Sequence, residues 1–513
     1  MSVTLNLLAE IAGATLHPAS AGDLQVSDIG INAAEVPADG IFAAVPGTRS
    51  HGARYAHQSQ GVAVLTDAAG YEILQEAGDP PPVLLVDEVR PILGRVADAV
   101  YGHPSAEMTV IGITGTSGKT TTTYLLEGAL MAAGRRVGLI GTTGTRINGR
   151  TVPSHLTTPE APELHKLFRT MADEGVTHVV MEVSSHAVML GRVGGLAFDV
   201  TAFLNLSQDH LDFHDTMDEY FAAKALLFDP AGDLHAPRTV ICTDDAWGQR
   251  MAELADGPGV RVTTAATMAA NPPVEDADWV AGPPEVAING LQHVVVRGPE
   301  RDVDLEVPLP GAFNIANATV AWALLDAVGC ATDEARAGLS DVAVPGRMER
   351  IDEGQDFLAV VDYAHKPAAV GAALDTLRDH LDGRLIIVFG AGGNRDRTKR
   401  AKMGAEAVRA ADEIIITDDN PRHEDPEAIR QDIIAGAEEA AARRGDGQRP
   451  RIHNIAGRAA AIAAAVQLAG PGDAVIVAGK GHETGQDVGG HMHPFDDRIE
   501  LRRALRDARG DQK

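Results

Sequence analysis

The stretch from Gly112 to Thr122 carries the residue types that bind a nucleotide phosphate. It reads Gly-Ile-Thr-Gly-Thr-Ser-Gly-Lys-Thr-Thr-Thr, and its glycines let the backbone approach phosphate oxygens. Lys119 adds a mobile cation, and the Thr120 hydroxyl can reach a magnesium ion that bridges the phosphates. The sequence therefore predicts an ATP site, with contacts from Gly115, Thr116, Ser117, Gly118, Lys119, Thr120 and Thr121.

Two predicted elements hold this phosphate loop. The apolar run 108–113 predicts a buried strand, and residues 120–130 predict a helix whose N-terminus attracts anions. The general phosphate-loop pattern needs glycine five positions before the Gly-Lys pair, where this chain has Ile113. The loop is therefore a compressed variant, and an ordinary strand-to-helix turn is the alternative interpretation.

Further polar groups follow other predicted strands, and ligands collect at the carboxyl ends of strands in an open parallel sheet. Glu182 lies near the end of one such strand and is a candidate magnesium ligand. Residues 205–214 are dense in ligand-capable groups. That density favours a site role for His210, although a lone histidine is more often an ordinary loop or core residue.

Lysine is rare in this chain. Of 44 basic residues only eight are lysine, so arginine is the usual base. A lysine kept against that habit suggests a need for a compact or modifiable amine. Lys119, Lys224 and Lys480 therefore stand out, although Lys224 by itself reads as a solvated lysine on an amphipathic helical turn.

Composition restricts the class of protein. A net charge of -28 without a basic run argues against nucleic acid or an anionic membrane as partner, and favours small-molecule substrates. No segment approaches the ~18 apolar residues of a membrane span, so no membrane insertion is expected. Cys242 and Cys330 lie far apart in apolar contexts, which suits a reducing compartment and predicts a cytoplasmic location. We expect a monomer.

Strand and helix patterns alternate along the chain, which predicts the α/β class. With 513 residues the chain is long enough for about three domains. The predicted domains are residues 1–103, 104–344 and 345–513, with a strand-rich extension of the middle domain at 255–310. The predicted strands are 40–45, 62–66, 83–86, 137–142, 178–184, 199–206, 239–243, 357–362, 385–389, 413–417 and 474–478.

The ordered motifs of the chain resemble those of the Mur ligases, most closely of the members that add the third residue of the peptidoglycan stem peptide. The resemblance covers nearly the whole chain. It is carried by the phosphate loop at 115–121, Thr157-Thr158-Pro159, residues 182–186, 205–214 and 223–228, 311–317, 345–350, 362–365, 390–400, Asp419-Asn420-Pro421-Arg422 and 479–483.

This resemblance implies three α/β domains: a small N-terminal domain that binds a UDP substrate, a central ATPase-like parallel sheet, and a C-terminal Rossmann-like domain that binds an amino acid. It implies an ATP-dependent ligase acting on UDP-N-acetylmuramoyl-L-alanyl-D-glutamate. The γ-phosphate would pass to the substrate carboxylate, and an amine would attack the resulting acyl phosphate. Catalytic roles are implied for Lys119, Glu182, His210 and Lys224.

The resemblance also implies metal ions and a modified lysine. One magnesium ion would be held by Thr120 and Glu182, and a second would lie near His210. An ammonium repels magnesium, but the family carbamylates the lysine at the position of Lys224 with carbon dioxide. The carbamate is a carboxylate-like metal ligand.

Further binding residues are implied for the nucleotide and the UDP substrate. Asn314 would contact adenine or ribose, Arg347 a phosphate, and Asp362 would support the nucleotide; helix capping is the alternative role for Asn314. The implied UDP-substrate residues are Thr157, Thr158, Ser184 and Arg192.

The chain departs from the family at other substrate positions. Ile31-Asn32-Ala33 stands where the family commonly has Asp-Ser-Arg, and Leu156 and Leu190 replace polar residues. The contacts that the first domain makes with UDP are therefore not assigned.

The motif at 419–422 predicts which amino acid is added. Relatives that add meso-diaminopimelate carry Asp-Asn-Pro-Arg, as this chain does, so Arg422 and Arg395 would grip the far carboxylate while Asn420 and Glu483 meet the far ammonium. L-Lysine lacks that carboxylate, and a buried arginine left without a partner costs about 2–5 kcal/mol. The full implied set is Arg395, Asp419, Asn420, Pro421, Arg422, Gly479 and Glu483.

Other interpretations stay open at this point. Asn420-Pro421 is also a turn signal, and Arg422 could cap a helix. An L-lysine-adding ligase, a sister ligase that adds D-glutamate or D-alanyl-D-alanine, and a folate-polyglutamylating enzyme would share the fold. A non-catalytic nucleotide-binding protein belongs to a different class. Binding alone does not require the complete set of Lys119, Glu182, His210 and Lys224.

Overall fold

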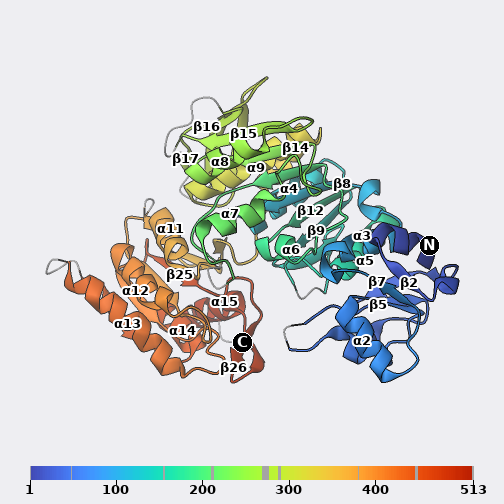
Figure 1. Ribbon diagram of the computed structural model, residues 1–513. Helices are drawn as coiled ribbons and strands as arrows, with labels where there is room; N and C mark the ends of the chain where they lie inside the picture. Colours follow the sequence, from blue (N-terminus) through green and yellow to red (C-terminus); the bar gives the residue numbers. More distant parts are fainter. Residues whose placement is uncertain are drawn as a thin grey trace. The chain divides into compact units, whose positions relative to one another are not determined.

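The computed structural model describes residues 2–47, 49–153, 156–209, 213–268, 277–286, 291–378, 381–444 and 449–510. The chain forms two compact units (Figure 1). The first unit comprises residues 1–283, 295–305 and 316–341. The second unit comprises residues 284–294, 306–315 and 342–513.

The N-terminal part of the first unit is a small α/β sheet. Its strand order is β2-β7-β6-β5-β4, parallel except for the β2–β7 pair. The helices follow local signals, since Thr4 caps the first helix and Asp67 caps the second. The elements are β1 (Val3–Thr4), α1 (Leu5–Ala12), β2 (Thr15–His17), β3 (Gln25–Val26), β4 (Asp28–Gly30), β5 (Gly40–Ala43), β6 (Ala63–Thr66), α2 (Ala68–Ala77), β7 (Val83–Leu85) and α3 (Val89–Val100).

A longer sheet is formed by strands between residues 109 and 307, most of which belong to the first unit. Its described order begins β11-β10-β9-β12-β8-β13-β14-β15-β16-β18. The strands from β9 to β16 pair in parallel, so their carboxyl ends share one edge. The strands are β8 (Thr109–Thr114), β9 (Val137–Gly141), β10 (Gly144–Ile147), β11 (Arg150–Val152), β12 (His178–Glu182), β13 (Val200–Phe203), β14 (Arg238–Cys242), β15 (Arg261–Thr267), β16 (Trp279–Ala281), β17 (Glu285–Val286), β18 (Gln292–Arg297) and β19 (Val303–Val307).

Helices connect most of the parallel strands of this sheet, because parallel neighbours need a crossover connection, and two further helices follow β19. Thr216 caps α7 by accepting the backbone N–H of Glu219, and the carboxylates of Asp218 and Glu219 suit the positive N-terminus of that helix. The helices are α4 (Lys119–Ala132), α5 (Ala161–Asp173), α6 (Ser185–Met189), α7 (Met217–Ala225), α8 (Ala246–Ala255), α9 (Ala312–Ala327) and α10 (Asp333–Ser340).

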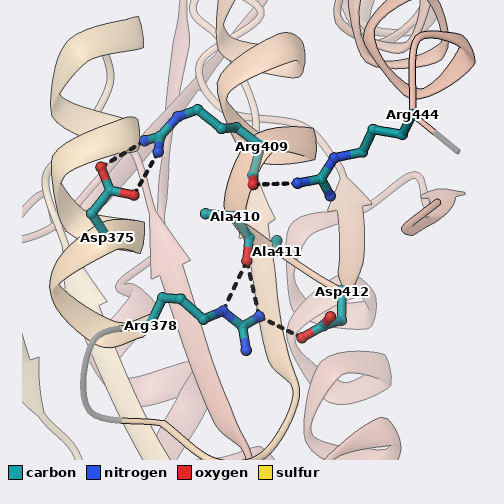
Figure 2. Close-up of a pocket in the computed structure, with 7 residues that line it drawn as sticks. All are labelled: Asp375, Arg378, Arg409, Ala410, Ala411, Asp412 and Arg444. Carbon is teal, nitrogen blue, oxygen red and sulfur yellow. Dashed lines mark hydrogen bonds and ion pairs between the residues drawn. The ribbon is translucent and has the colours of Figure 1, made fainter. Parts of the chain in front are cut away.

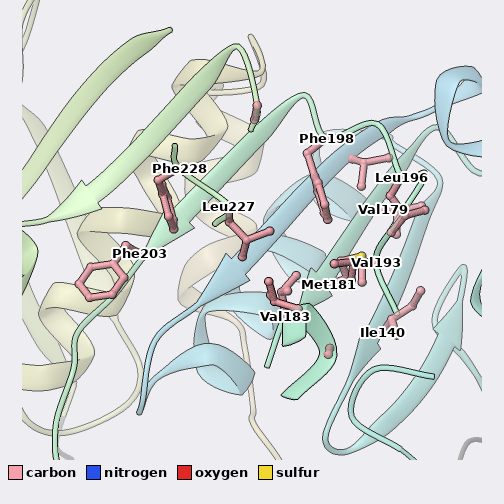
Figure 3. Packing of buried hydrophobic residues seen from close by; sticks show 14 of the residues in the cluster. Ile140, Val179, Met181, Val183, Val193, Leu196, Phe198, Phe203, Leu227 and Phe228 are labelled. Carbon is pink, nitrogen blue, oxygen red and sulfur yellow. The ribbon is translucent and has the colours of Figure 1, made fainter. Parts of the chain in front are cut away.

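One hydrophobic cluster packs against a face of the central sheet. Alternate residues of β12, Val179 and Met181, point into it, because successive side chains of a strand face opposite sides. Figure 3 shows them with Phe198, Phe203 and Phe228. These residues are at most 5% exposed, so the strand ends that carry polar groups are anchored in a close-packed interior.

The second unit is built on a doubly wound sheet of order β20-β21-β25-β22-β23-β24. All neighbours pair in parallel except β20 with β21. Hydrophobic clusters cover both faces of the sheet. Its elements are β20 (Glu349–Arg350), β21 (Leu358–Asp362), α11 (Pro367–Arg378), β22 (Leu385–Phe389), α12 (Thr398–Ala410), β23 (Glu413–Ile416), α13 (Pro426–Ala442), β24 (Arg451–Asn454), α14 (Arg458–Leu468), β25 (Ala474–Ala478) and α15 (Asp497–Ala508).

A β-hairpin follows the last parallel strand of the second unit. It pairs β26 (Gly485–Val488) with β27 (His491–Pro494) through the two residues Gly489 and Gly490. Both glycines have positive φ, 63° and 81°, which a two-residue turn of type I′ requires. The hairpin is therefore a locally specified structure.

The predicted α/β class is confirmed. The predicted parallel strands are found within one or two residues of their expected ends, except that the strand predicted at 199–206 ends three residues early, at Phe203. The predicted strand-rich stretch 255–310 contains β15 to β19. Strand β24 was not predicted, because Arg-Ile-His-Asn has only one apolar residue. The boundaries at 103 and 344 stay a prediction.

Candidate active site

The phosphate loop connects β8 to α4. Gly118 has φ 88°, and a Cβ atom there would lie 2.3 Å from Oδ1 of Asn317, so only glycine fits without rearrangement. Asn205, just after β13, fixes the loop from the other side: its Oδ1 accepts the N–H of Ser117 at 3.0 Å and its Nδ2 donates to the Ser117 carbonyl at 3.1 Å. The loop is thus held in place by neighbouring strand ends.

Two lysines converge on one carbonyl oxygen of this loop. Lys119 Nζ donates to the carbonyls of Gly115 at 2.7 Å and Thr116 at 3.1 Å. Lys224, from α7, is 1% exposed; its Nζ donates to the same Gly115 oxygen at 3.1 Å and lies 4.7 Å from the Tyr220 ring centroid. The chain therefore buries Lys224 beside the phosphate loop.

Glu182, the last residue of β12, is 1% exposed and has a hydroxyl or amide donor on each carboxylate oxygen. Its Oε1 accepts the Thr120 hydroxyl at 2.8 Å and the N–H of Thr142 at 2.9 Å, and its Oε2 accepts the Thr142 hydroxyl at 3.0 Å. We call Lys119, Thr120, Thr142, Glu182 and Lys224 the phosphate-loop cluster. Its hard oxygen donors fit a magnesium ion.

The predicted UDP-substrate residues lie next to this cluster. The Thr157 hydroxyl is 3.2 Å from that of Thr142, and the Thr158 hydroxyl donates to the carbonyl of Glu182 at 2.9 Å. Ser184 caps α6 by accepting the N–H of Ala187. The Arg192 guanidinium donates to the Thr158 carbonyl at 3.2 Å and lies 2.7 Å from Glu160. The structure therefore joins Thr157, Thr158 and Glu182 into one network.

His210 lies outside the described residues, and its role stays a prediction. Thr121 lies in the first turn of α4 and is 6% exposed. Asn314, in the second unit, is 2% exposed and its Nδ2 donates to the Pro310 carbonyl at 2.8 Å.

Arg347 and Asp362, also in the second unit, lie around one turn. The Arg347 guanidinium stacks over the Tyr363 ring at 4.3 Å. The Asp362 carboxylate accepts the N–H groups of Met348 and Ala364, both at 2.8 Å. Burial raises the pKa of Asp362 above its ordinary value, against the opposing effect of the nearby Arg347 charge.

The turn at 419–422 packs against a glycine turn that precedes Arg395. The N–H of Gly393 donates to the Asn420 carbonyl at 2.9 Å, and a Cβ atom on Gly393 would lie 2.0 Å from the Pro421 carbonyl. Arg422 has φ 53°, and its guanidinium donates to the Gly393 carbonyl at 2.7 Å. Arg395 is exposed. The two arginine-bearing turns are therefore bonded to each other.

The hairpin β26–β27 fixes the same turn. The N–H of Arg422 donates to the Asp487 carbonyl at 3.0 Å, and Gln486 Nε2 donates to the Asp419 carbonyl at 2.6 Å. The Asp487 carboxylate lies 3.9 Å from Nε of Arg422. Arg422 thus has internal partners and is 28% exposed, so the discrimination expected of a buried, unpaired arginine is reduced.

Lys480 links the remaining predicted residues of this region. Its Nζ donates to Oδ1 of Asn420 at 3.0 Å and to Oε2 of Glu483 at 2.8 Å. Gly479 has φ 118°, and a Cβ atom there would lie 2.8 Å from Oδ2 of Asp419. We call Asp419, Asn420, Arg422, Lys480 and Glu483 the amino-acid cluster.

Buried charged side chains next to this cluster set the ionisation state of Asp419. Burial alone would raise the pKa of Asp419, but the positive charges of Arg458 and Lys480 outweigh it and hold that pKa below its ordinary value. Arg458 forms a bidentate pair with Asp497 at 2.7 Å, and both side chains are 0% exposed. This network keeps Asp419 ionised.

Sequence reasoning missed three contributors to these sites. Thr142 follows β9, the neighbour of β12, and the rule on strand ends could have found it. The only sequence signal for the hairpin is the Gly489-Gly490 turn, and that signal does not indicate that the hairpin contacts the turn at 419–422. Nothing in the sequence pairs Arg458 with Asp497.

A surface hollow of about 360 Å³ lies elsewhere in the second unit (Figure 2). Its three arginines have partners within it: Arg409 pairs with Asp375, Arg378 with Asp412, and Arg444 donates to the Arg409 carbonyl. None of the predicted site residues lines it. The hollow therefore has no part in the two clusters.

No helix among the described residues is long and apolar enough to cross a membrane. Among these residues, no group of three or more His, Cys, Asp or Glu side chains is arranged to hold a metal ion. A magnesium ion at Glu182 would thus need ligands of other kinds, such as the Thr120 hydroxyl.

Comparisons with known proteins place the chain in a family. The Mur ligase middle domain matches residues 113–325, and the Mur ligase, glutamate ligase domain matches residues 346–481. The UDP-N-acetylmuramoyl-L-alanyl-D-glutamate--2,6-diaminopimelate ligase of Corynebacterium glutamicum is 56% identical over 94% of this chain and 92% of that protein. The ligase of the same name from Streptomyces avermitilis is 46% identical over 99% of this chain and 98% of that protein.

A solved structure of a UDP-N-acetylmuramoyl-L-alanyl-D-glutamate--2,6-diaminopimelate ligase superimposes with a TM-score of 0.69 at 29% identity, covering 99% of this chain and all of that one. Sequence and fold thus agree along almost the entire length. Because its relatives align from end to end at far more than 30% identity, this chain belongs to the Mur ligase family.

Proposed function

We propose that this chain is an ATP-dependent ligase that joins meso-2,6-diaminopimelate to UDP-N-acetylmuramoyl-L-alanyl-D-glutamate. The observation that carries the proposal is the 56% identity, over nearly the full length, with a ligase named for these two substrates. The chemistry of the two clusters supports it independently. One cluster suits phosphoryl transfer, and the other suits an amino acid with a charged far end.

The first step would be phosphoryl transfer from ATP to the D-glutamate side-chain carboxylate of the UDP substrate, forming an acyl phosphate. The Lys119 ammonium already lies against the phosphate loop, where it bonds two carbonyls. Phosphate oxygens are charged and therefore stronger acceptors, so bound ATP would draw the ammonium away from those carbonyls. Lys119 would then stabilise the charge that develops on the transferred group.

Thr120 and Glu182 would hold a magnesium ion beside the loop. Their oxygens lie 2.8 Å apart at a buried position, and hydroxyl and carboxylate oxygens are the donors that magnesium prefers. The ion would supply charge neutralisation for the phosphates. Thr142 would keep the Glu182 carboxylate oriented, because it donates to both carboxylate oxygens.

Lys224 would act as a carbamate. A buried ammonium bonded to the phosphate loop repels a metal cation, and it is an amine only after it loses a proton. Reaction of that amine with carbon dioxide gives a negatively charged carbamate and releases one proton. The product would serve as a further oxygen ligand, with His210 as a second candidate for metal binding.

The second unit would hold the incoming amino acid. Arg422 and Arg395 would bind the far carboxylate of diaminopimelate, and Glu483 its far ammonium. Asn314, Arg347 and Asp362 stay proposed nucleotide residues. The free amine of diaminopimelate would then attack the acyl phosphate, which forms the amide and releases phosphate.

The decisive experiment measures ADP release with the UDP-muramoyl dipeptide, ATP and magnesium. Parallel reactions contain meso-diaminopimelate, L-lysine, D-alanyl-D-alanine or no amine. We expect release that depends on diaminopimelate. Release only with L-lysine or D-alanyl-D-alanine would contradict the substrate assignment. Silence with every amine would favour a sister ligase that takes another acceptor, or a non-catalytic nucleotide binder.

We further propose that the enzyme acts as a cytoplasmic monomer. Cys242 and Cys330 are both buried and unpaired with each other, which suits a reducing compartment. Sedimentation equilibrium would test the monomer, for which we expect a mass near 53.8 kDa. A mass of twice that value at micromolar concentration would contradict it.

A further inference from the structure

Lys480 closes a ring of three side chains inside the amino-acid cluster. It is 0% exposed, and its Nζ donates to Asn420 Oδ1 at 3.0 Å and to Glu483 Oε2 at 2.8 Å. Asn420 Nδ2 donates to the same Glu483 oxygen at 2.9 Å. Each member of the ring is therefore held by both others.

The ring determines which acceptor atoms a ligand can reach. Asn420 Oδ1 also accepts the N–H of Asp487 at 3.0 Å, so both lone pairs of that oxygen are engaged. Glu483 Oε2 already accepts two donors. Within the described part of the chain, Oε1 of Glu483 accepts no hydrogen bond, and the side chain is 33% exposed. Glu483 Oε1 is thus the oxygen left for an ammonium.

Lysine is suited to this position in a way that arginine is not. The two acceptors lie within 3.0 Å of one nitrogen atom, which a compact ammonium serves without the extra volume of a planar guanidinium. The neighbouring Arg458 is already paired with Asp497. Lys480 therefore supplies the balancing charge for Glu483 in a chain that otherwise prefers arginine.

We propose that Lys480 is a positioning residue that locks Asn420 and Glu483, so that Glu483 Oε1 alone meets the far ammonium of the incoming amino acid. Asn420 then acts through Glu483 and does not bind the ligand through its amide oxygen. The inference rests on the proposed function, because it assigns a role within the diaminopimelate site.

The first test compares Lys480→Met with Lys402→Met, which removes an exposed lysine of the same unit. For Lys480→Met we expect the KM for meso-diaminopimelate to rise about 10- to 100-fold, as for loss of a charged hydrogen bond. The KM for ATP, the KM for the UDP substrate and kcat should change less than about threefold, and Lys402→Met should match the wild type. A purely structural lysine would instead lower the melting temperature and change all parameters together, which would overturn the proposal.

A double-mutant cycle separates positioning from direct binding. If Lys480 acts through Glu483, Lys480→Met combined with Glu483→Gln raises the KM for diaminopimelate no further than Glu483→Gln alone. If the two substitutions instead raise the KM for diaminopimelate by the product of their separate effects, the inference is overturned. Should Lys480→Met fail to fold, Lys480→Gln, which keeps a hydrogen-bond donor in the buried position, takes its place in the cycle. A wild type without diaminopimelate-dependent ADP release would contradict the proposed function itself, whereas an active wild type with an unchanged KM in Lys480→Met contradicts only this inference.

Discussion

The phosphate-loop cluster and the amino-acid cluster satisfy their charges in opposite ways. In the first, charged atoms bond mainly to neutral groups: Lys119 and Lys224 share the Gly115 carbonyl, and Glu182 accepts from Thr120 and Thr142. In the second, ammonium and carboxylate pair directly, as in Lys480 with Glu483. The two sites therefore differ in the partners of their charged groups.

This difference indicates which contacts a ligand replaces. Hydrogen bonds from a charged group to neutral acceptors are weaker than those to charged oxygens, so phosphate can displace the Gly115 carbonyl. Breaking a fully buried ion pair from one side costs about 3–5 kcal/mol. The Lys480–Glu483 pair is only half buried, so the cost is smaller, but a ligand still binds beside the pair rather than in its place. Loss of a charge should therefore impair chemistry in the first cluster and recognition in the second.

Lys119→Met tests the first half of this comparison and should have the largest effect. Removal of a cation that stabilises developing charge lowers kcat by about 10³-fold, with a smaller change in the KM for diaminopimelate. Steady-state ADP release measures both. Lys166→Met removes an exposed lysine of the same unit and should leave kcat unchanged. A Lys119→Met enzyme with a normal kcat and a raised KM for diaminopimelate would mean that the phosphate-loop cluster serves recognition rather than chemistry, which contradicts the comparison of the two clusters.

Lys224→Ala tests whether this buried amine acts as a carbamate, and we expect kcat to fall about 10²-fold. Acetate or formate should restore part of the activity, because a small carboxylate can enter the space that the side chain leaves and supply the missing oxygen ligand. Chloride at the same ionic strength is the control. Loss of activity without rescue by either acid would count against the carbamate.

The sequence was sufficient where function follows from local patterns. The compressed loop at 115–121 and the strand before Glu182 follow from glycine spacing and apolar runs. The structure places the Thr120 hydroxyl 2.8 Å from the Glu182 carboxylate. The catalytic roles of these residues stay predictions. His210 stays one as well, because it lies outside the described residues.

The sequence was insufficient where contacts depend on strand order or on distant packing. Thr142 reaches Glu182 only because β9 lies beside β12, although 40 residues separate them. The pairing of Arg422 with Asp487 requires the hairpin to fold back on the turn. Such partners lower the expected selectivity of Arg422, and no local pattern encodes them.

Arg422→Asn tests recognition in the second cluster. Asparagine tolerates the positive φ of this position, so the change removes the guanidinium with little backbone strain. We expect the preference of kcat/KM for diaminopimelate over L-lysine to fall about tenfold, since the guanidinium is partly exposed and already has internal partners. Arg443→Asn, on the surface of α13, is the control. An unchanged preference would exclude Arg422 as the carboxylate ligand.

His365 provides the smallest test of whether the second unit keeps its charges fixed. Burial, followed by the charges of Lys366 and Lys399, lowers the pKa of His365 to about 4, so the imidazole is neutral at working pH. The unfolded chain binds a proton near pH 6.5 and the folded one only near pH 4. The stability that this group contributes is therefore present above pH 6.5. About 1–2 kcal/mol of it is lost as the pH falls towards 4, for a half-buried side chain.

Titration of the imidazole by NMR, with His365→Gln to assign the signal, should give a midpoint near 4. Urea unfolding at pH 6.5 and pH 4 should show the loss of stability in the wild type and a smaller loss in the variant. A midpoint near 6.5 would mean that the charge around the amino-acid cluster changes at physiological pH. The second unit would then not keep its charges fixed, and the contrast between the amino-acid cluster and the phosphate-loop cluster would not hold.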